Sequence, residues 1–531
     1  MHDRLSAATL AAAQPNRERV TGPAVEAGTP TIGIVHFGIG AFHRAHQAVF
    51  TEDAAAATGA SGWGILGVTG RSDSVVRQLR PQDCLYGVLV RGVDETRLRL
   101  VASVRDVAWP GEESDRIAEV IAAPATHLAT LTITEKGYLR GTNGNIDLTR
   151  DSVQSDLRLI AAELADASVS APAGASATPI GLLVRGLARR FRRGGAPFTV
   201  VPCDNLADNG PTTRRLVRSL VAALADAPDA VHAGAPDSSQ ATDPAPAVAF
   251  ATWLDTSVTF PSTMVDRIAP ATTEADRDAA EALLGLRDEA LVVAEPFAQW
   301  VIEDDFAGPR PAWEKAGAIL TDDVAPYERV KLRVLNASHS MLAYLGALRG
   351  HETIAEAVAD PTLRDAVLAV LDDDILPTLT APPGIDLARY RDTVLARFAN
   401  PSLAHTTRQV GMDGSQKLPI RILSAARDRI AAGHMPRGLA LAVAAWVTFI
   451  ASTADAGSPP LDDPLADELH AAVPSIDALE LDPDAVVARL FALDSVFPAD
   501  LRDNPDFRAA VVAQLPVVRA LADAGAPAQA G

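Results

Sequence analysis

The sequence has little cysteine, no excess of basic charge and no apolar run long enough to cross a membrane. Only Cys84 and Cys203 occur among its 531 residues, and they stand far apart. This argues against a disulfide scaffold and against a cysteine-type zinc site. Lysine and arginine number 47 against 67 acidic residues, a net charge of −20. Because phosphate neutralisation supplies most of the affinity for nucleic acids, we expect no nucleic-acid partner.

The longest apolar stretch, residues 439–451, is shorter than the ~20 residues that a membrane span requires. It predicts a buried helix in a soluble protein with no membrane partner. The first residues lack the basic-then-apolar order of a secretory signal, so we expect a cytoplasmic location. A chain of 531 residues is long enough for two or three domains.

Short runs rich in Val, Ile, Leu and Thr alternate with helical segments in the first half of the chain. This alternation is typical of an α/β fold, a mainly parallel sheet covered on both faces by helices. Two segments dense in Ala, Pro, Ser and Gly, residues 167–179 and 226–247, predict surface loops. The expected strands lie within residues 31–40, 63–70, 96–104, 127–134 and 197–203.

After about residue 320 the strand patterns fade and helical patterns prevail. We therefore predict three parts. Residues 1–30 form a mobile or loosely docked N-terminal arm. Residues 31–315 form a Rossmann-type dinucleotide-binding domain, and residues 316–531 form a mainly α-helical domain that carries substrate and catalytic residues.

A glycine turn follows the first expected strand. Gly38 allows a tight turn, and Gly40 lets the backbone approach the phosphates of a dinucleotide at the start of a helix. The third glycine of the usual pattern is replaced by His43. After the second strand, Asp73 favours the ribose hydroxyls of NAD, whereas Arg71 would suit the additional phosphate of NADP. The predicted cofactor is NAD, with NADP left open.

Lys331, Asn336 and His339 stand in the pattern K-x-x-x-x-N-x-x-H. On an α-helix they would lie at about 0°, 140° and 80°, so all three can border one cleft. Each alone fits a structural role. Together they supply a base for a hydroxyl proton and donors for the alkoxide that forms as hydride leaves. A lysine can be this base where desolvation or positive charge lowers its pKa from ~10.4.

No zinc site is predicted. His43 and His46 stand three residues apart, but no cysteine or acidic residue is spaced with them as a further ligand. The sequence therefore favours a metal-independent dehydrogenase.

Taken together, these motifs resemble the polyol-specific long-chain dehydrogenases, the family of mannitol 2-dehydrogenase and fructuronate reductase (D-mannonate oxidoreductase). The resemblance covers about residues 31–510. The matching segments are IVHFGIGAFHRAHQ (34–47), LTITEKGY (131–138), PFTVVPCDNLADNG (197–210), FPSTMVDRIAP (260–270), EPFAQWVIEDDF (295–306), KLRVLNASHSMLAYLG (331–346) and MDGSQKLPIR (412–421).

The resemblance implies an active site between the two domains, with Lys331 as general acid/base. It implies that Asn205 and Asn336 hold the reacting oxygen and that His339 orients the substrate. The remaining residues follow from the same matches: Asp266 close to the lysine, Glu135 passing a proton to solvent, Lys417 contacting the far end of the substrate, and Phe42 and Arg44 binding the cofactor beside Gly38, Gly40 and Asp73.

One departure concerns the substrate. Mannitol enzymes of the family carry an arginine eight residues before the last lysine, where this chain has Gln409 with Arg408 adjacent. We include Arg408 among the expected substrate contacts. The EKGY and MDGSQK motifs look more like fructuronate reductase. D-mannitol/D-fructose and D-mannonate/D-fructuronate therefore both stay open as substrate pairs.

Three alternative functions are less consistent with these motifs. A mannitol 1-phosphate dehydrogenase would need a phosphate site that the matched motifs do not supply. A 6-phosphogluconate dehydrogenase would have the spacing K-x-x-x-N. A silent NAD-binding regulator would not need the catalytic residues, which this chain retains: Lys331, Asn205, Asn336 and His339. The expected partner is a small polyol or sugar acid, and the expected assembly is a monomer or small homo-oligomer. The arginines at 189, 190, 192 and 193 are interpreted as a solvated helix end.

Overall fold

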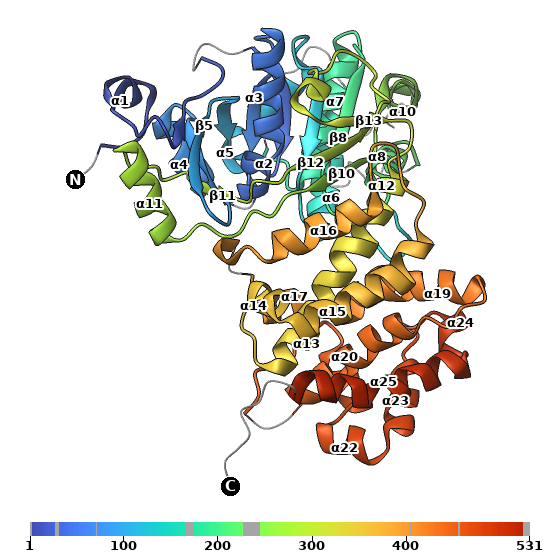
Figure 1. The fold of residues 1–531 in the computed structure, drawn as a ribbon. Coiled ribbons are helices and arrows are strands. Elements are labelled where there is room, and N and C mark those ends of the chain that lie inside the picture. Colours follow the sequence, from blue (N-terminus) through green and yellow to red (C-terminus); the bar gives the residue numbers. More distant parts are fainter. Residues whose placement is uncertain are drawn as a thin grey trace. The chain divides into compact units, whose positions relative to one another are not determined.

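The computed structural model describes residues 3–26, 31–70, 72–165, 174–226, 245–403, 405–454 and 457–523. Arg71 and most of the two predicted low-complexity loops lie outside the described residues. The chain forms two compact units, residues 1–324 (unit 1) and residues 325–531 (unit 2). Figure 1 shows the elements of each unit.

Unit 1 is built on a six-stranded sheet in which every neighbouring pair is parallel. Its strand order is β6-β3-β2-β7-β8-β9. If the strands are numbered along the chain within this sheet, the order becomes 3-2-1-4-5-6, which is the order of the dinucleotide-binding Rossmann fold. The predicted fold class is confirmed. The strands are β2 Ile32–Phe37, β3 Gly64–Val68, β6 Val104–Ala108, β7 Leu128–Leu131, β8 Phe198–Pro202 and β9 Val258–Thr259.

Helices cover both faces of this sheet because its strands are apolar on both sides. In β2, Val35 and Phe37 join one buried cluster, whereas Ile34 joins another. The first cluster packs against α5 Pro110–Ala122, α6 Asp151–Ala165, α7 Pro179–Arg192, α8 Asn209–Asp226 and α10 Ala245–Ser257. The second packs against α2 Ala41–Ala45, α3 Gln47–Thr58 and α4 Ser74–Leu79.

The expectation that residues 96–104 form a strand of the main sheet was wrong. They form β5 Thr96–Val101, which pairs antiparallel with β4 Tyr86–Arg91 in a separate sheet of order β1-β5-β4-β11. β5 has exposed and buried residues mixed along its length, as expected for a strand with one face outside the core. The other strands of unit 1 are β1 Val20–Thr21, β10 Thr263–Asp266, β11 Val292–Ala294, β12 Gln299–Glu303 and β13 Ile319–Thr321.

The described N-terminal segment is packed rather than loose. Leu5 is fully buried, and its backbone N–H donates to the carbonyl of Arg287 at 2.8 Å. Strand β1 pairs with β5, and α1 Ala7–Ala12 begins with a capping box at Ser6. This segment therefore adds to the core of unit 1. The described part of this unit also contains helix α11, Glu274–Leu284.

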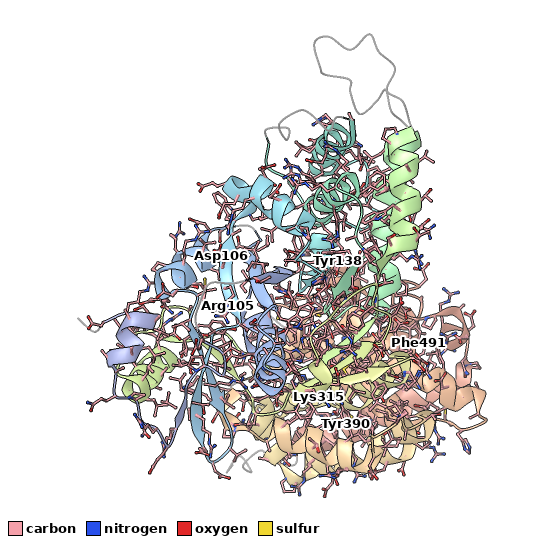
Figure 2. All side chains as sticks on the ribbon, turned by 90° about the horizontal axis from the view of Figure 1, so that it is seen from above. Arg105, Asp106, Tyr138, Lys315, Tyr390 and Phe491 are labelled. Atoms are coloured by element: carbon pink, nitrogen blue, oxygen red, sulfur yellow. The ribbon has the colours of Figure 1, made fainter. Side chains whose placement is uncertain are left out.

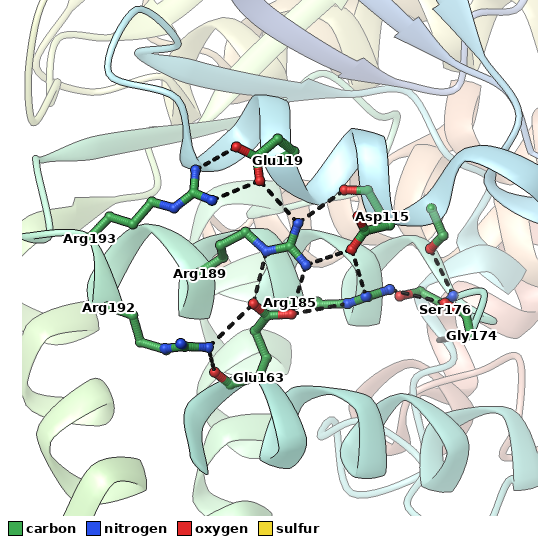
Figure 3. A network of polar contacts seen from close by, with 10 residues as sticks. Asp115, Glu119, Glu163, Gly174, Ser176, Arg185, Arg189, Arg192 and Arg193 are labelled. Carbon is green, nitrogen blue, oxygen red and sulfur yellow. Dashed lines mark hydrogen bonds and ion pairs between the residues drawn. The ribbon is translucent and has the colours of Figure 1, made fainter. Parts of the chain in front are cut away.

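The interpretation of the arginine cluster as a solvated helix end was wrong for Arg189 and Arg190, although Arg193 is exposed. Arg189 is only 4% exposed, and it donates two hydrogen bonds to Glu163, at 2.8 and 2.9 Å. It also contacts Asp115 and Glu119, so it joins α7 to both α5 and α6 (Figure 3). Arg190 is equally buried and donates to carbonyls of the neighbouring loops. These side chains fasten three helices together.

Unit 2 is helical, as predicted, and its core includes the apolar segment 439–451. That segment lies within α20 Arg437–Thr453, nearly all of which is buried. No helix within the described ranges is both long and apolar enough to span a bilayer. The α-helices are α12 Ala325–Val330, α13 Ala337–Arg349, α14 Ile354–Ala359, α15 Pro361–Val370, α16 Leu387–Phe398, α17 Thr407–Gly411, α18 Gly414–Leu418, α19 Ser424–Ala431, α20, α21 Ala466–Ala472, α22 Ile476–Leu481, α23 Pro483–Phe491, α24 Ala499–Arg502 and α25 Pro505–Asp523.

Three segments expected as regular α-helix contain π-helical turns. These turns are η4 Lys331–Asn336, η5 Leu371–Ile375 and η8 Pro419–Leu423. A π turn bonds residue i to residue i+5 and is frequent at functional sites. The turn η4 contains the predicted site residues Lys331 and Asn336, and η8 begins two residues after Lys417.

Candidate active site

The predicted site residues are divided between the two units. Unit 1 holds the glycine turn and the residues that follow strands β3, β7, β8 and β10. Unit 2 holds Lys331 and Asn336 of the π turn, His339 of α13, and the predicted substrate cations Arg408 and Lys417.

The glycine turn lies where the strand order of the main sheet reverses. Gly38 follows β2 and has φ +98°, and an added Cβ would lie 2.3 Å from the carbonyl oxygen of Thr132, beyond the end of β7. Only glycine fits there. Gly40 is open, since the nearest atom to an added Cβ lies at 3.8 Å. Ligands of open α/β sheets bind at this reversal point, outside the carboxyl ends of the strands.

His43 takes the place of the third glycine without opening the turn. Its ring is buried and stacks on His36, with centroids 3.3 Å apart. After the turn the chain forms two helices, α2 and α3, separated at His46, which has φ −125° and ψ −89°. His36 is held by Thr130 at 2.7 Å and Thr132 at 2.9 Å. Burial lowers the pKa of His36 to about 3.

A prediction for stability follows from His36. Its pKa is about 3 in the folded chain, against 6.5 for an ordinary histidine, so the unfolded chain binds the proton more tightly. The stabilisation is complete above pH 6.5 and is lost as pH falls towards 3. Between pH 7 and pH 5 this group alone should lower the free energy of unfolding by about 2 kcal/mol. In urea unfolding, His36→Gln should show a pH dependence weaker by that amount, and an unchanged slope would contradict this assignment.

The other predicted cofactor residues differ in burial and in the contacts that their side chains already make. Arg44 is buried, and its guanidinium donates to the carbonyls of Ala290 and Gly40. A direct contact with a cofactor would need these bonds to be exchanged. Phe42 is half-buried and stacks on His46, with centroids 5.1 Å apart. Asp73, beyond β3, is half-buried and pairs with Arg77 at 2.6 Å.

Three predicted catalytic residues of unit 1 lie at or just beyond the ends of strands. Glu135 is exposed and opens the 3₁₀ turn η2 Glu135–Tyr138, after β7. Asn205 is exposed and follows β8. Asp266 is 5% exposed and ends β10, which belongs to a separate three-stranded sheet. Parallel strands β7 and β8 are neighbours, so Glu135 and Asn205 follow adjacent strand ends.

The loops after β7 and β8 are joined by a pair that the sequence did not single out. The hydroxyl of Tyr138, labelled in Figure 2, donates to the carboxyl of Asp204. Burial raises the pKa of Asp204 well above its usual range. Asp204 directly precedes Asn205, and Tyr138 lies three residues after Glu135. The pair therefore fixes the backbone that carries both predicted site residues.

In unit 2, the π turn changes the predicted arrangement of the lysine motif. Lys331 and Asn336 are its first and last residues, and the N–H of Ala337 bonds to the carbonyl of Leu332. On a regular α-helix, Lys331 and Asn336 would differ by about 140° in direction. Because a π turn closes after about five residues, it brings positions i and i+5 towards the same face. The turn therefore aligns the two residues better than the α-helix that the sequence suggested.

Two buried polar atoms, one in this turn and one in the first turn of α13, have no hydrogen-bond partner within the described part of the chain. They are Nδ2 of Asn336 and Nε2 of His339. Such atoms are costly to bury alone, so they mark a place where a polar ligand fits. The His339 ring stacks on Phe398 with centroids 4.6 Å apart. Burial, His405 and the cations Arg421, Lys417 and Arg397 hold the pKa of His339 well below its usual value, so its ring is neutral at neutral pH.

The predicted substrate cations differ in burial. Lys417 is half-buried, its Nζ lies 3.3 Å from the carbonyl of Val410, and burial together with Arg421 lowers its pKa. Arg408 and Gln409 are exposed on α17. Arg421, in the π turn η8, donates to Ser340 at 2.9 Å and to the carbonyl of Asn336 at 3.4 Å. This arginine links η8 to the lysine motif.

Sequence reasoning missed Arg421, although it stands in the quoted MDGSQKLPIR segment. Its signal was an arginine four residues after Lys417, which is one helical turn and places both on one face. Phe398 and the Tyr138–Asp204 pair carried no such signal. In the described ranges, no group of three or more His, Cys, Asp or Glu side chains is arranged to hold a metal ion.

The Rossmann strand order and the glycine turn at its reversal point are those of a dinucleotide-binding oxidoreductase fold. Family models agree for nearly the whole chain. Residues 32–315 match the mannitol dehydrogenase Rossmann domain, and residues 323–518 match the mannitol dehydrogenase C-terminal domain. The chain therefore belongs to the mannitol dehydrogenase family.

Named relatives include D-mannonate oxidoreductase of Escherichia coli, 39% identical across 90% of this chain and 92% of that protein. Mannitol 2-dehydrogenase of Cereibacter sphaeroides is 36% identical across 82% and 85%. Among solved structures, the Pseudomonas fluorescens mannitol 2-dehydrogenase complex with NAD and D-mannitol matches with TM-score 0.76 and 34% identity, covering 97% of each chain. A substrate-free D-sorbitol dehydrogenase matches with TM-score 0.82 and 29% identity, covering 99% and 100%.

Proposed function

We propose that this protein is an NAD-dependent oxidoreductase that interconverts a linear sugar acid or polyol with its keto form, without a metal, using Lys331 as general acid/base. The observation that carries the proposal is the π turn Lys331–Asn336 with its unpartnered amide and, one turn later, an unpartnered histidine nitrogen. A lysine, an amide donor and a neutral imidazole are the groups that a reacting secondary alcohol needs.

The glycine turn fits a dinucleotide. Gly38 provides the tight bend, and the open space at Gly40 leaves room for a pyrophosphate against the backbone. Asp73 follows the second strand of the sheet but is displaced from the strand end, where an acidic residue usually holds the ribose hydroxyls; we propose it for that role. When bound, NAD accepts or returns the hydride of the alcohol carbon. NADP stays a second possibility, since Arg71 lies outside the described residues.

The chain's own residues handle the oxygen and its proton. In the oxidation direction the amine of Lys331 accepts the hydroxyl proton. The amides of Asn336 and Asn205 donate hydrogen bonds to the oxygen, and these bonds strengthen as negative charge develops on it. His339, held neutral, positions a neighbouring substrate hydroxyl. Exposed Glu135 passes the proton to water, and Asp266 supports the charge on the lysine.

The cations of unit 2 favour the sugar acid as substrate. Lys417, Arg421 and Arg397 all act electrostatically on His339, so a carboxylate at the far end of the substrate would be attracted there. Exposed Arg408 adds a further cation on α17, beside Gln409. D-fructuronate/D-mannonate is therefore the first substrate pair and D-fructose/D-mannitol the second. The named D-mannonate and mannitol relatives support the same two pairs.

An assay of the purified chain tests this proposal, with NADH and NADPH against D-fructuronate and D-fructose, and with NAD⁺ and NADP⁺ against mannitol 1-phosphate. We expect NADH oxidation with D-fructuronate, with D-fructose as the weaker substrate. Activity with mannitol 1-phosphate alone would instead favour the phosphorylated-polyol alternative. Inactivity with every substrate, despite measurable NADH binding, would favour the silent regulator.

Metal independence makes a separate prediction. If Lys331 performs the proton transfer, extended treatment with EDTA followed by desalting should leave kcat unchanged within error. The control is the same preparation with Zn²⁺ or Mn²⁺ added back. A loss of activity that either metal restores would show that a metal ion supports the reaction.

A further inference from the structure

Unit 1 contains a large open cavity outside every predicted site residue. Its volume is ≈1280 Å³. Its walls are the loop Arg140–Arg150, the side of α6 that carries Gln154 and Leu157, and the side of α8 from Pro211 to Ala223. We call it the arginine cavity.

The charge of this cavity is opposite to that of the whole protein. Five arginines line it, and Asp147 is the single carboxylate among the described residues of its lining. Asp147 is itself paired with Arg150 at 3.0 Å. A local excess of guanidinium groups stands out in a chain of net charge −20, because a net negative charge disfavours anions on average. The lining arginines are Arg140, Arg150, Arg214, Arg215 and Arg218.

Three of these guanidinium groups are available for a ligand. Arg218 pairs with Asp255 at 3.0 Å, outside the lining. Within the described ranges, the side chains of Arg140, Arg214 and Arg215 make no hydrogen bond or ion pair. All three are exposed. They come from two different elements, the loop after η2 and helix α8, so their charges converge on the cavity from two walls.

The loop wall is fixed by its own hydrogen bonds. The N–H of Gly141 donates to the carbonyl of Asn145 and that of Asp147 to the carbonyl of Leu139, both at 2.8 Å. The N–H of Ile146 donates to the hydroxyl of Ser219 on α8 at 3.1 Å, and Ile146 is buried. The loop is therefore tied to α8 before any ligand arrives, and an ordered loop loses little entropy on binding.

We propose that the arginine cavity binds a phosphorylated small molecule with two or more negative charges. Guanidinium groups pair with phosphate oxygens through two parallel hydrogen bonds. The cavity also offers the polar side chains of Thr142, Asn143 and Thr149. A nucleic acid is a poorer fit, because the strongly acidic remainder of the chain would repel its backbone. None of the lining residues belongs to the proposed reaction, so this site is independent of it.

Calorimetric titration of the full chain at low salt tests the proposal, with pyrophosphate, fructose 1,6-bisphosphate and ATP as probes and citrate as a carboxylate comparison. We expect saturable binding of at least one phosphorylated probe at one site per chain, with citrate weaker. Binding of pyrophosphate as well as one larger probe would identify phosphate itself as the recognised group. Preference for ATP or for the bisphosphate would separate a nucleotide from a sugar phosphate.

The variant Arg214→Gln/Arg215→Gln should weaken the binding about tenfold or more. The free energy lost with one charge-assisted hydrogen bond corresponds to about a tenfold loss of affinity. Arg140→Gln provides the same test from the loop wall. The matched control is Arg17→Gln, an exposed arginine of unit 1 outside the lining, which should bind as the parent chain does. No binding of any phosphorylated probe, citrate binding as tightly, or equal losses in the control would each overturn the proposal.

Discussion

Replacing Lys331 by alanine is expected to lower kcat by about 10² to 10⁴ while leaving NADH binding nearly unchanged. This is the range that a positioned general acid/base contributes. Lys331 belongs to unit 2, whereas the proposed dinucleotide residues belong to unit 1, so loss of the amine should not disturb the cofactor site. Fluorescence titration with NADH and steady-state rates for the best keto substrate measure the two effects separately.

Two further variants make this test specific. Lys331→Arg keeps the positive charge but cannot release a proton near neutral pH, so it should be as inactive as the alanine variant. Lys315→Ala removes an exposed lysine of η3 Trp313–Ala316, labelled in Figure 2, and should retain full activity. Near-parental turnover of Lys331→Arg would mean that charge, rather than proton transfer, is what position 331 supplies.

Alanine at the two glycines of the turn should affect different properties: the stability of the fold at Gly38 and the affinity for NADH at Gly40. Gly38→Ala places a methyl group 2.3 Å from the Thr132 carbonyl at φ +98°. We expect it to lower the free energy of unfolding by about 3 to 5 kcal/mol. Gly40→Ala meets no atom nearer than 3.8 Å, so stability should change by less than about 0.5 kcal/mol. Its methyl group should still weaken NADH binding about tenfold or more, because it occupies the space left for the pyrophosphate.

Thermal or urea unfolding without cofactor, followed by NADH titration of the folded variants, distinguishes these effects. Each glycine is the control for the other, since they are two residues apart. Unchanged NADH affinity in Gly40→Ala would place the dinucleotide elsewhere. Unchanged stability in Gly38→Ala would mean that the turn relaxes and that the left-handed conformation is not required.

The sequence predicted most strands of the main sheet because each of them can be recognised from its own residues. β2, β3, β7 and β8 are short, almost fully buried runs, and such runs separated by helices indicate parallel strands. β5 carried a similar signal, but its sheet is decided by pairing with β4, which no local pattern reveals. The burial of Arg189 was missed for the same reason, since its partners Glu163 and Asp115 stand 26 and 74 residues away.

At the site, the sequence supplied the residue types and their spacing, but not the backbone that presents them. The π turn at Lys331–Asn336 is accompanied by hydrogen bonds that Arg421 donates from η8 to Asn336 and Ser340, and no local pattern reveals these contacts. Helical periodicity assumes a regular α-helix and therefore placed Asn336 about 140° away from Lys331, whereas the π turn brings the two towards one face. The turn at Gly38 was predictable, since a strand followed by two glycines and a helix is a local pattern.

Transfer of deuterium from NADH labelled at the reactive nicotinamide carbon tests the central claim most directly. The purified chain is incubated with the labelled cofactor and D-fructuronate, and in parallel with D-fructose, and each product is analysed by mass spectrometry. The account predicts a product that carries one deuterium on the new alcohol carbon, in EDTA-treated protein, and about 10² to 10⁴ times less of it in the same time with Lys331→Ala. A product without deuterium, or no product from either substrate, would contradict it.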